Sequence, residues 1–88
     1  MNKNIEYFNL TNEFLTTTIP VGRYEQLKET IRYHEYLYYV KDSPIITDYI
    51  YDMIYDKLKK LEKEHPEIIT PDSPTQRPAS DFLKSYEP

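Results

Sequence analysis

The sequence RYEQLKETIRYHEYLYYVK, residues 23–41, decides the fold of this chain. Its apolar and aromatic residues recur at spacings of three and four, at Tyr24, Leu27, Ile31, His34 and Tyr38. This spacing places them in one stripe along an α-helix, and charged and polar residues fill the opposite face. The pattern predicts a helix over about 23–41. The segment Asp42-Ser43-Pro44 should end it, because the residue before a proline is pushed out of the α region.

A second helix is predicted over about 48–65. Its apolar stripe consists of Tyr51, Ile54, Tyr55, Leu58 and Leu61. Thr47 or Asp48 is a suitable N-cap, and Pro66 ends the pattern. Two striped helices joined by a turn of six or seven residues indicate an antiparallel hairpin. The predicted fold is therefore all-α, with the hairpin at 23–66 as its central unit.

The two ends of the chain have weaker patterns. Residues 1–22 contain scattered apolar side chains that fit an additional N-terminal helix over about 4–16, although the Thr16-Thr17-Thr18 run favours extended structure. This segment could instead dock onto a partner. Residues 67–88 are rich in proline and lack periodicity, which predicts an extended C-terminal arm without stable packing beyond Pro71.

Composition excludes several classes of protein. The 88 residues carry a net charge of −4, which is unfavourable for a domain that binds duplex DNA by itself. There is no cysteine, so disulfides and thiolate metal sites are absent from the sequence. The single glycine precludes a glycine-rich phosphate loop. No continuous apolar run indicates a membrane span or a secretion signal, so we expect a cytoplasmic protein without membrane contacts.

Six of the ten tyrosines lie in two short blocks, YHEYLYY at 33–39 and DYIYD at 48–52. A hairpin would bring the end of the first helix to the start of the second and gather five side chains at one pole: Tyr38, Tyr39, Asp48, Tyr51 and Asp52. Aromatic rings there can stack on a ring or a positive charge, and carboxylates can accept hydrogen bonds from hydroxyls or amides. We therefore expect a binding site for a flat, cationic, hydroxyl-bearing ligand such as nicotinamide riboside. We expect no catalytic residue and no metal ligand in the chain.

These features also have structural interpretations. Acidic residues are common at helix starts, yet Thr47 or Asp48 suffices as a cap, which leaves Asp52 without a structural task. Tyr33 and Tyr36 are expected to be half-buried under the N-terminal segment, and His34 to lie in the core. A tyrosine-rich pole also suits protein docking. A free-standing, non-catalytic helical interaction module is thus the alternative function.

The ordered motifs resemble one known family. These motifs are Tyr33 to Tyr39, Pro44, Thr47-Asp48, Tyr51-Asp52, Leu58, Leu61-Glu62, His65-Pro66-Glu67 and Thr70-Pro71-Asp72-Ser73-Pro74-Thr75-Gln76-Arg77. Together, over about 24–77, they closely resemble the N-terminal domain of bacterial NAD-dependent DNA ligases. The resemblance implies a module that holds the nicotinamide mononucleotide (NMN) half of NAD while a ligase lysine is adenylated. It also implies that Tyr38, Tyr39, Asp48, Tyr51 and Asp52 contact this ligand.

The resemblance further implies partners outside these residues. They are a nucleotidyltransferase domain of the same ligase, and nicked DNA reached only through the full enzyme. Magnesium and zinc are expected only in the other parts of such a ligase. The chain departs from the family pattern at Ile50, where a glutamate is common, and after Arg77. Because the sequence has no Lys-x-Asp-Gly nucleophile motif, we expect it to be inactive alone, as an excised domain more than as a free-standing homologue.

Overall fold

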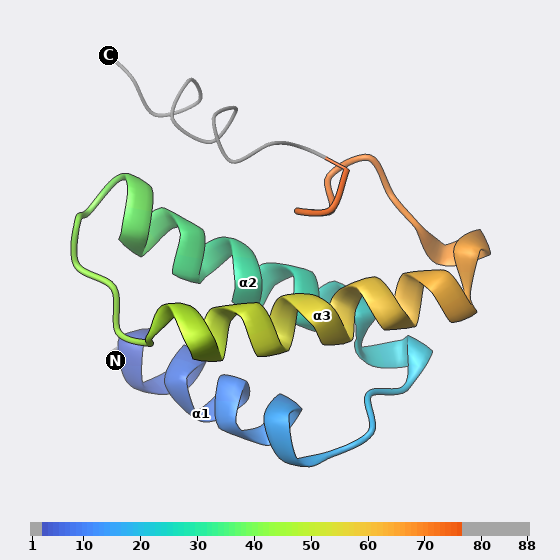
Figure 1. The fold of residues 1–88 in the computed structure, drawn as a ribbon, viewed down its shortest axis with the longest axis horizontal. Coiled ribbons are helices and arrows are strands. Elements are labelled where there is room, and N and C mark those ends of the chain that lie inside the picture. Colours follow the sequence, from blue (N-terminus) through green and yellow to red (C-terminus); the bar gives the residue numbers. More distant parts are fainter. Residues whose placement is uncertain (1–2, 77–88) are drawn as a thin grey trace.

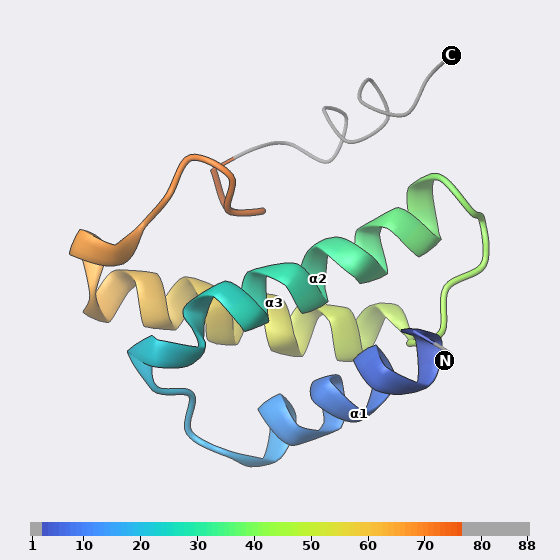
Figure 2. The ribbon, with the colours of Figure 1, turned by 180° about the vertical axis from the view of Figure 1, so that it is seen from behind.

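The computed structural model describes residues 3–76 as a bundle of three α-helices and two short 3-10 helices (Figures 1 and 2). The elements are α1 Lys3–Thr16, η1 Val21–Arg23, α2 Tyr24–Tyr39, α3 Asp48–Glu64 and η2 Pro66–Ile68. Helices α2 and α3 run antiparallel, and α1 packs against both of them. No strand occurs in this described part of the chain, which confirms the all-α prediction. The predicted N-terminal helix is also confirmed, as α1.

The core lies where the three helices meet. It consists of the buried residues Phe14, Tyr24, Leu27, Ile31, Ile54, Leu58 and Leu61. Phe14 comes from α1, so the N-terminal helix completes the core that the hairpin begins. None of the helices among residues 3–76 is long and apolar enough to cross a membrane.

The connection between α2 and α3, residues 40–47, is one residue longer than the predicted turn of six or seven, and Thr47 caps α3 as predicted. At the end of α2 the backbone reverses at Asp42, which has a φ of 51°, and the Ser43 N–H donates to the Leu37 carbonyl at 2.8 Å. Aspartate tolerates this left-handed conformation better than most side chains. Thr47 then caps α3, because its hydroxyl accepts a hydrogen bond from the Ile50 N–H at 3.2 Å. This cap fixes where α3 begins and hence where the carboxylates of its first turns project.

One member of the predicted stripe on α2 lies outside the core. Tyr38 is 50% exposed, whereas its neighbour Leu37 is only 6% exposed. The helical spacing was correct, but Tyr38 lies in the last turn of α2, where it lines the cavity at the pole of the hairpin and is not part of the buried cluster. The stripe therefore continues into the pole of the hairpin and not into the core.

The segment after α3 corrects a second expectation. Residues 70–75 fold back onto the hairpin (Figure 1). Ser73 is completely buried there. The buried Glu62 carboxylate accepts hydrogen bonds from the hydroxyls of Tyr24, Ser73 and Thr75 at 2.5–2.7 Å. The prediction that packing ends at Pro71 is therefore wrong for 72–75, because these residues use polar contacts that apolar periodicity does not reveal. The rest of the predicted arm, 77–88, lies outside the described residues.

A buried lysine holds the start of the same segment. The Lys28 side chain is 3% exposed, and its Nζ donates to Thr70 Oγ1 at 2.5 Å and to Asp72 Oδ1 at 2.9 Å. Glu25 supplies a third acceptor at 2.8 Å. Burial of Lys28 would lower its pKa, but these acceptors stabilise the charged form and the resulting pKa is raised. Lys28 and Glu62 therefore fasten the segment to the hairpin at two points.

Candidate functional site

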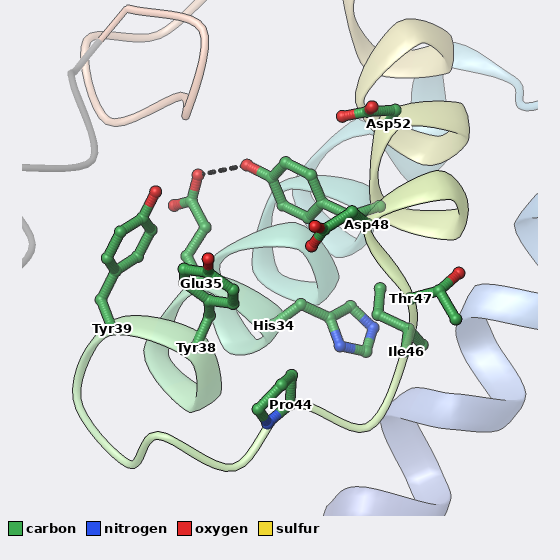
Figure 3. A pocket seen from close by; sticks show the side chains of 10 residues that line it. His34, Glu35, Tyr38, Tyr39, Pro44, Ile46, Thr47, Asp48 and Asp52 are labelled. Atoms are coloured by element: carbon green, nitrogen blue, oxygen red, sulfur yellow. Dashed lines mark hydrogen bonds between the residues drawn. The ribbon is translucent and has the colours of Figure 1, made fainter.

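A cavity of about 290 Å³ lies at the pole where α2 ends and α3 begins (Figure 3). Its walls come from the last turns of α2, from the connection between the helices and from the first two turns of α3. The lining residues are His34, Glu35, Tyr38, Tyr39, Pro44, Ile46, Thr47, Asp48, Tyr51 and Asp52. The structure thus brings all five residues singled out by the sequence around one cavity.

Tyrosines form the aromatic part of the wall. Tyr38 and Tyr39 are 50% and 41% exposed, and their rings meet edge to face with centroids 4.8 Å apart. Tyr51 approaches from α3 and stacks on Tyr55 with centroids 5.8 Å apart. Tyr38 and Tyr39 are therefore partly open to solvent, whereas Tyr51 is held by a hydrogen bond to Glu35 and by its contact with Tyr55.

Glu35 fixes Tyr51 in place. The Tyr51 hydroxyl donates to Glu35 Oε2 at 2.6 Å, a bond that connects α3 to α2 across the cavity (Figure 3). Burial raises the pKa of the Glu35 carboxyl, and the hydrogen bond from Tyr51 and the charge of Arg32 offset this rise only in part. The same burial and the nearby carboxylate strongly raise the pKa of Tyr51, so its hydroxyl stays protonated and acts as a donor.

His34 forms part of the cavity wall and is only 3% exposed. The Thr11 hydroxyl donates its single proton to the Tyr7 carbonyl at 2.8 Å, so it must accept from His34 Nε2 at 2.6 Å. This assigns the imidazole proton to Nε2 and leaves Nδ1 as an acceptor. Nδ1 is buried and has no hydrogen-bond partner among the described residues. Burial lowers the pKa of His34 to about 4, so the ring is neutral at pH 7.

Asp48 and Asp52 lie one turn apart at the start of α3, and both are exposed. Because Thr47 provides the side-chain cap, neither carboxylate is needed for that task. The two aspartates therefore add negative charge to the cavity while remaining available to a ligand. Across residues 3–76 no group of three histidine or acidic side chains is arranged to hold a metal ion.

The cavity is thus suited to holding an aromatic ring and hydrogen-bond donors. Comparisons with known proteins identify the family. Residues 18–78 match the family described as the DNA ligase-like, N-terminal NAD+-binding domain. The chain belongs to this family. The match includes the whole hairpin and every residue that lines the cavity.

Individual relatives carry the name DNA ligase. The protein from Aquifex aeolicus is 53% identical over 70 residues, which are 73% of this chain and 10% of the relative. The protein from Acidobacterium capsulatum is 64% identical over 53 residues, or 60% of this chain and 8% of the relative. The protein from Sulfurihydrogenibium azorense is 40% identical over 86 residues, 98% of this chain and 12% of the relative. The chain therefore spans about a tenth of the length of these ligases.

Sequence reasoning missed two cavity residues with polar functions, Glu35 and His34. Glu35 lies three and four residues before Tyr38 and Tyr39, so helical periodicity places it on the same side of α2 as both rings. That signal was available in the sequence. His34 was assigned to the core, which its burial confirms, but its position in the cavity wall depends on how the connection passes over it (Figure 3).

Proposed function

We propose that this chain is the module of an NAD-dependent DNA ligase that binds the NMN half of NAD during adenylation of the ligase lysine. The observation that carries the proposal is the convergence of Tyr38, Tyr39, Asp48, Tyr51 and Asp52 on one cavity. The cavity volume of about 290 Å³ is at the lower limit of small-molecule sites, which are about 300–1,000 Å³. This size favours half of a dinucleotide over the whole molecule.

Each residue has a role that its position supports. Tyr38 and Tyr51 would flank the nicotinamide ring from opposite helices, and Asp48 and Asp52 would accept hydrogen bonds from ribose hydroxyls or the carboxamide. Tyr39, which is partly exposed, would reach toward the phosphate. By orienting NMN as the leaving group, the module would accelerate attack by the lysine through proximity.

The lysine and the adenylate site would come from a nucleotidyltransferase domain of the same ligase. Residues 67–88 would lead toward that domain, and nicked DNA would be contacted by the full enzyme. Magnesium and zinc would bind in other parts of that enzyme. Such a ligase would act in DNA replication and repair in the cytoplasm.

A titration of the ¹⁵N-labelled chain with NMN and, separately, with AMP tests this proposal. We expect NMN to shift backbone amide signals around the cavity, with a dissociation constant on the order of a millimolar or weaker because half of the full site is absent. AMP should leave these signals unchanged. The Asp52→Asn variant should lose the response, whereas Asp56→Asn, one turn further along α3 and outside the cavity, should retain it.

Two results would overturn the proposal. One is an equal response to AMP and NMN, which would indicate unspecific binding. The other is an NMN response located away from the cavity or absent at tens of millimolar ligand.

A further inference from the structure

Residues 70–75 make two contacts with the hairpin besides those to its buried lysine and glutamate. The Arg32 guanidinium donates to the Asp72 carbonyl at 2.9 Å, and the Tyr55 hydroxyl donates to the Pro74 carbonyl at 3.5 Å. Pro74 is buried. Both acceptors are backbone carbonyls, so these contacts depend on where the backbone of residues 70–75 lies.

Arg32 connects this segment with the cavity wall. It lies almost one turn before Glu35 on α2, and its positive charge acts on the Glu35 carboxylate. Glu35 is only 7% exposed and also accepts a hydrogen bond from the Tyr51 hydroxyl at 2.6 Å. A buried carboxylate depends on donors and on nearby positive charge for its charged form. Loss of the Tyr51 bond would therefore draw Arg32 toward Glu35 and away from the Asp72 carbonyl.

Tyr55 provides a second connection between the same two places. Its ring stacks on the Tyr51 ring, with centroids 5.8 Å apart and an angle of 24° between the planes. The hydroxyl of the same ring reaches the Pro74 carbonyl over a long distance, which makes this the weaker of the two connections. Because the ring is rigid, movement of Pro74 would change the packing of Tyr55 against Tyr51.

We infer that Arg32 and Tyr55 are positioning residues that couple segment 70–75 to Tyr51. With the segment docked, Tyr51 is held in the cavity wall, and release of either one loosens the other. Such coupling acts equally in both directions. The inference holds for any ligand of the cavity and does not rest on the proposed function. In the proposed ligase, it would link filling of the cavity to the position of the chain that leads toward the next domain.

Hydrogen exchange in the ¹⁵N-labelled chain tests the direction from the cavity to the segment. The Ser73 and Gln76 amides report on the segment, because they donate to the Thr70 and Ser73 carbonyls at 3.2 and 2.9 Å. Tyr51→Phe keeps the ring but removes the bond to Glu35. We expect exchange at both amides to speed up about three- to tenfold relative to amides in the middle of α3, the effect of one lost hydrogen bond.

Tyr33→Phe is the matched control. It also removes one tyrosine hydroxyl from the hairpin, but this hydroxyl donates to Asn4 of α1. Exchange at Ser73 and Gln76 should then keep its wild-type ratio to exchange in the middle of α3. This ratio separates release of the segment from unfolding of the whole domain, which would speed exchange at all these amides together.

The reverse direction is tested at the Tyr51 ring. Ser73→Ala loosens the segment, because it removes the hydroxyl that donates to the buried Glu62 carboxylate at 2.6 Å. In the chain with ¹³C-labelled tyrosine, we expect this change to shift the ring signals of Tyr51 and to leave those of Tyr33 in place. Unchanged Tyr51 signals would overturn the coupling.

The combined variant Arg32→Gln with Tyr55→Phe cuts both connections. In this background, Tyr51→Phe should have no further effect on exchange at Ser73 and Gln76. If the combined variant is not folded by circular dichroism, Arg32→Gln alone replaces it. The effect of Tyr51→Phe on exchange should then be smaller than in the wild type.

Three results of the exchange measurements would overturn the inference. Exchange that is unchanged in Tyr51→Phe, or faster by the same factor in α3 and in the segment, would show that the two are not coupled. An equal effect of Tyr51→Phe with and without Arg32 and Tyr55 would remove the roles assigned to these residues. An equal acceleration by Tyr33→Phe would show that the response is not specific to the cavity wall. These measurements use no ligand, so each such result leaves the proposed function standing.

Discussion

Acid should destabilise this domain through His34, and the magnitude follows from its environment. The unfolded chain binds a proton at an ordinary pKa of 6.5, whereas burial lowers the pKa in the folded protein to about 4. Between these values the unfolded state binds more protons, so the free energy of unfolding falls as the pH falls. At about 1.36 kcal/mol for each pH unit, the full loss is roughly 3 kcal/mol, with about 2.5 kcal/mol of it reached at pH 4.5. Above pH 6.5 the effect disappears.

Urea unfolding followed by circular dichroism at pH 7.5 and pH 4.5 measures this loss. His34→Gln preserves a donor toward Thr11 but cannot titrate, so the difference between the two pH values should shrink by about 2.5 kcal/mol. His65→Gln, which changes the half-exposed histidine at the end of α3, should leave the difference in place. An equal pH dependence in the wild type and in His34→Gln would refute the assignment of His34 as a buried neutral group.

Three further predictions follow from the packing and from the sequence. Glu62→Gln should lower the free energy of unfolding by about 1–3 kcal/mol, because an amide nitrogen cannot accept the hydrogen bonds that hydroxyls donate to the carboxylate. It should also speed hydrogen exchange at the Ser73 and Gln76 amides. Unchanged exchange at these amides would contradict the packing of 70–75. Phe14→Ala should lower the free energy of unfolding by about 3–5 kcal/mol, enough to unfold most molecules of a domain of this size. Circular dichroism measures this loss, and a stably folded variant would show that the core does not need α1. The 88-residue chain should not become adenylated on incubation with NAD, since it lacks a Lys-x-Asp-Gly motif; a lysine-linked AMP adduct found by intact mass would contradict this.

The sequence predicted the helices well because their stability depends on apolar periodicity, which is a local property. The apolar stripe of α3 predicted both ends of that helix to within two residues. The stop at Asp42-Ser43-Pro44 did the same for the end of α2. Tyr38 shows where periodicity fails: it identifies the face of a helix but not how far along that face the partner helix extends. Tyr38 lies on the predicted stripe but is half exposed, because it lies in the last turn of α2, where the stripe reaches the cavity.

The polar contacts were less predictable, for a different physical reason. Ser73 is buried because Glu62, eleven residues earlier, accepts its hydroxyl, and Lys28 meets Asp72 across 44 residues. No composition rule for proline-rich segments anticipates such pairs, since their energy depends on geometry and not on residue class. At the cavity, helical spacing gathers the tyrosines and aspartates, and it would also have indicated Glu35. That His34 Nδ1 is an acceptor without a partner among residues 3–76 could not be predicted, because its tautomer follows from the hydrogen bonds of Thr11.

The most direct test of the proposed function separates the two steps of ligation in a chimeric enzyme. Residues 18–78 of this chain would replace the matching segment of the Aquifex aeolicus DNA ligase, and Asp52→Ala would be compared with Asp56→Ala in the same chimera. NMN is present only while the lysine is adenylated, so Asp52→Ala should slow adenylation by NAD roughly ten- to a hundredfold, the equivalent of about 1.5–3 kcal/mol for a lost charge-assisted contact. Sealing of a pre-adenylated nick should be nearly unchanged, and Asp56→Ala should affect neither step. An equal loss in both steps by a folded Asp52→Ala chimera, or no loss in either, would contradict the assignment of this cavity to NMN.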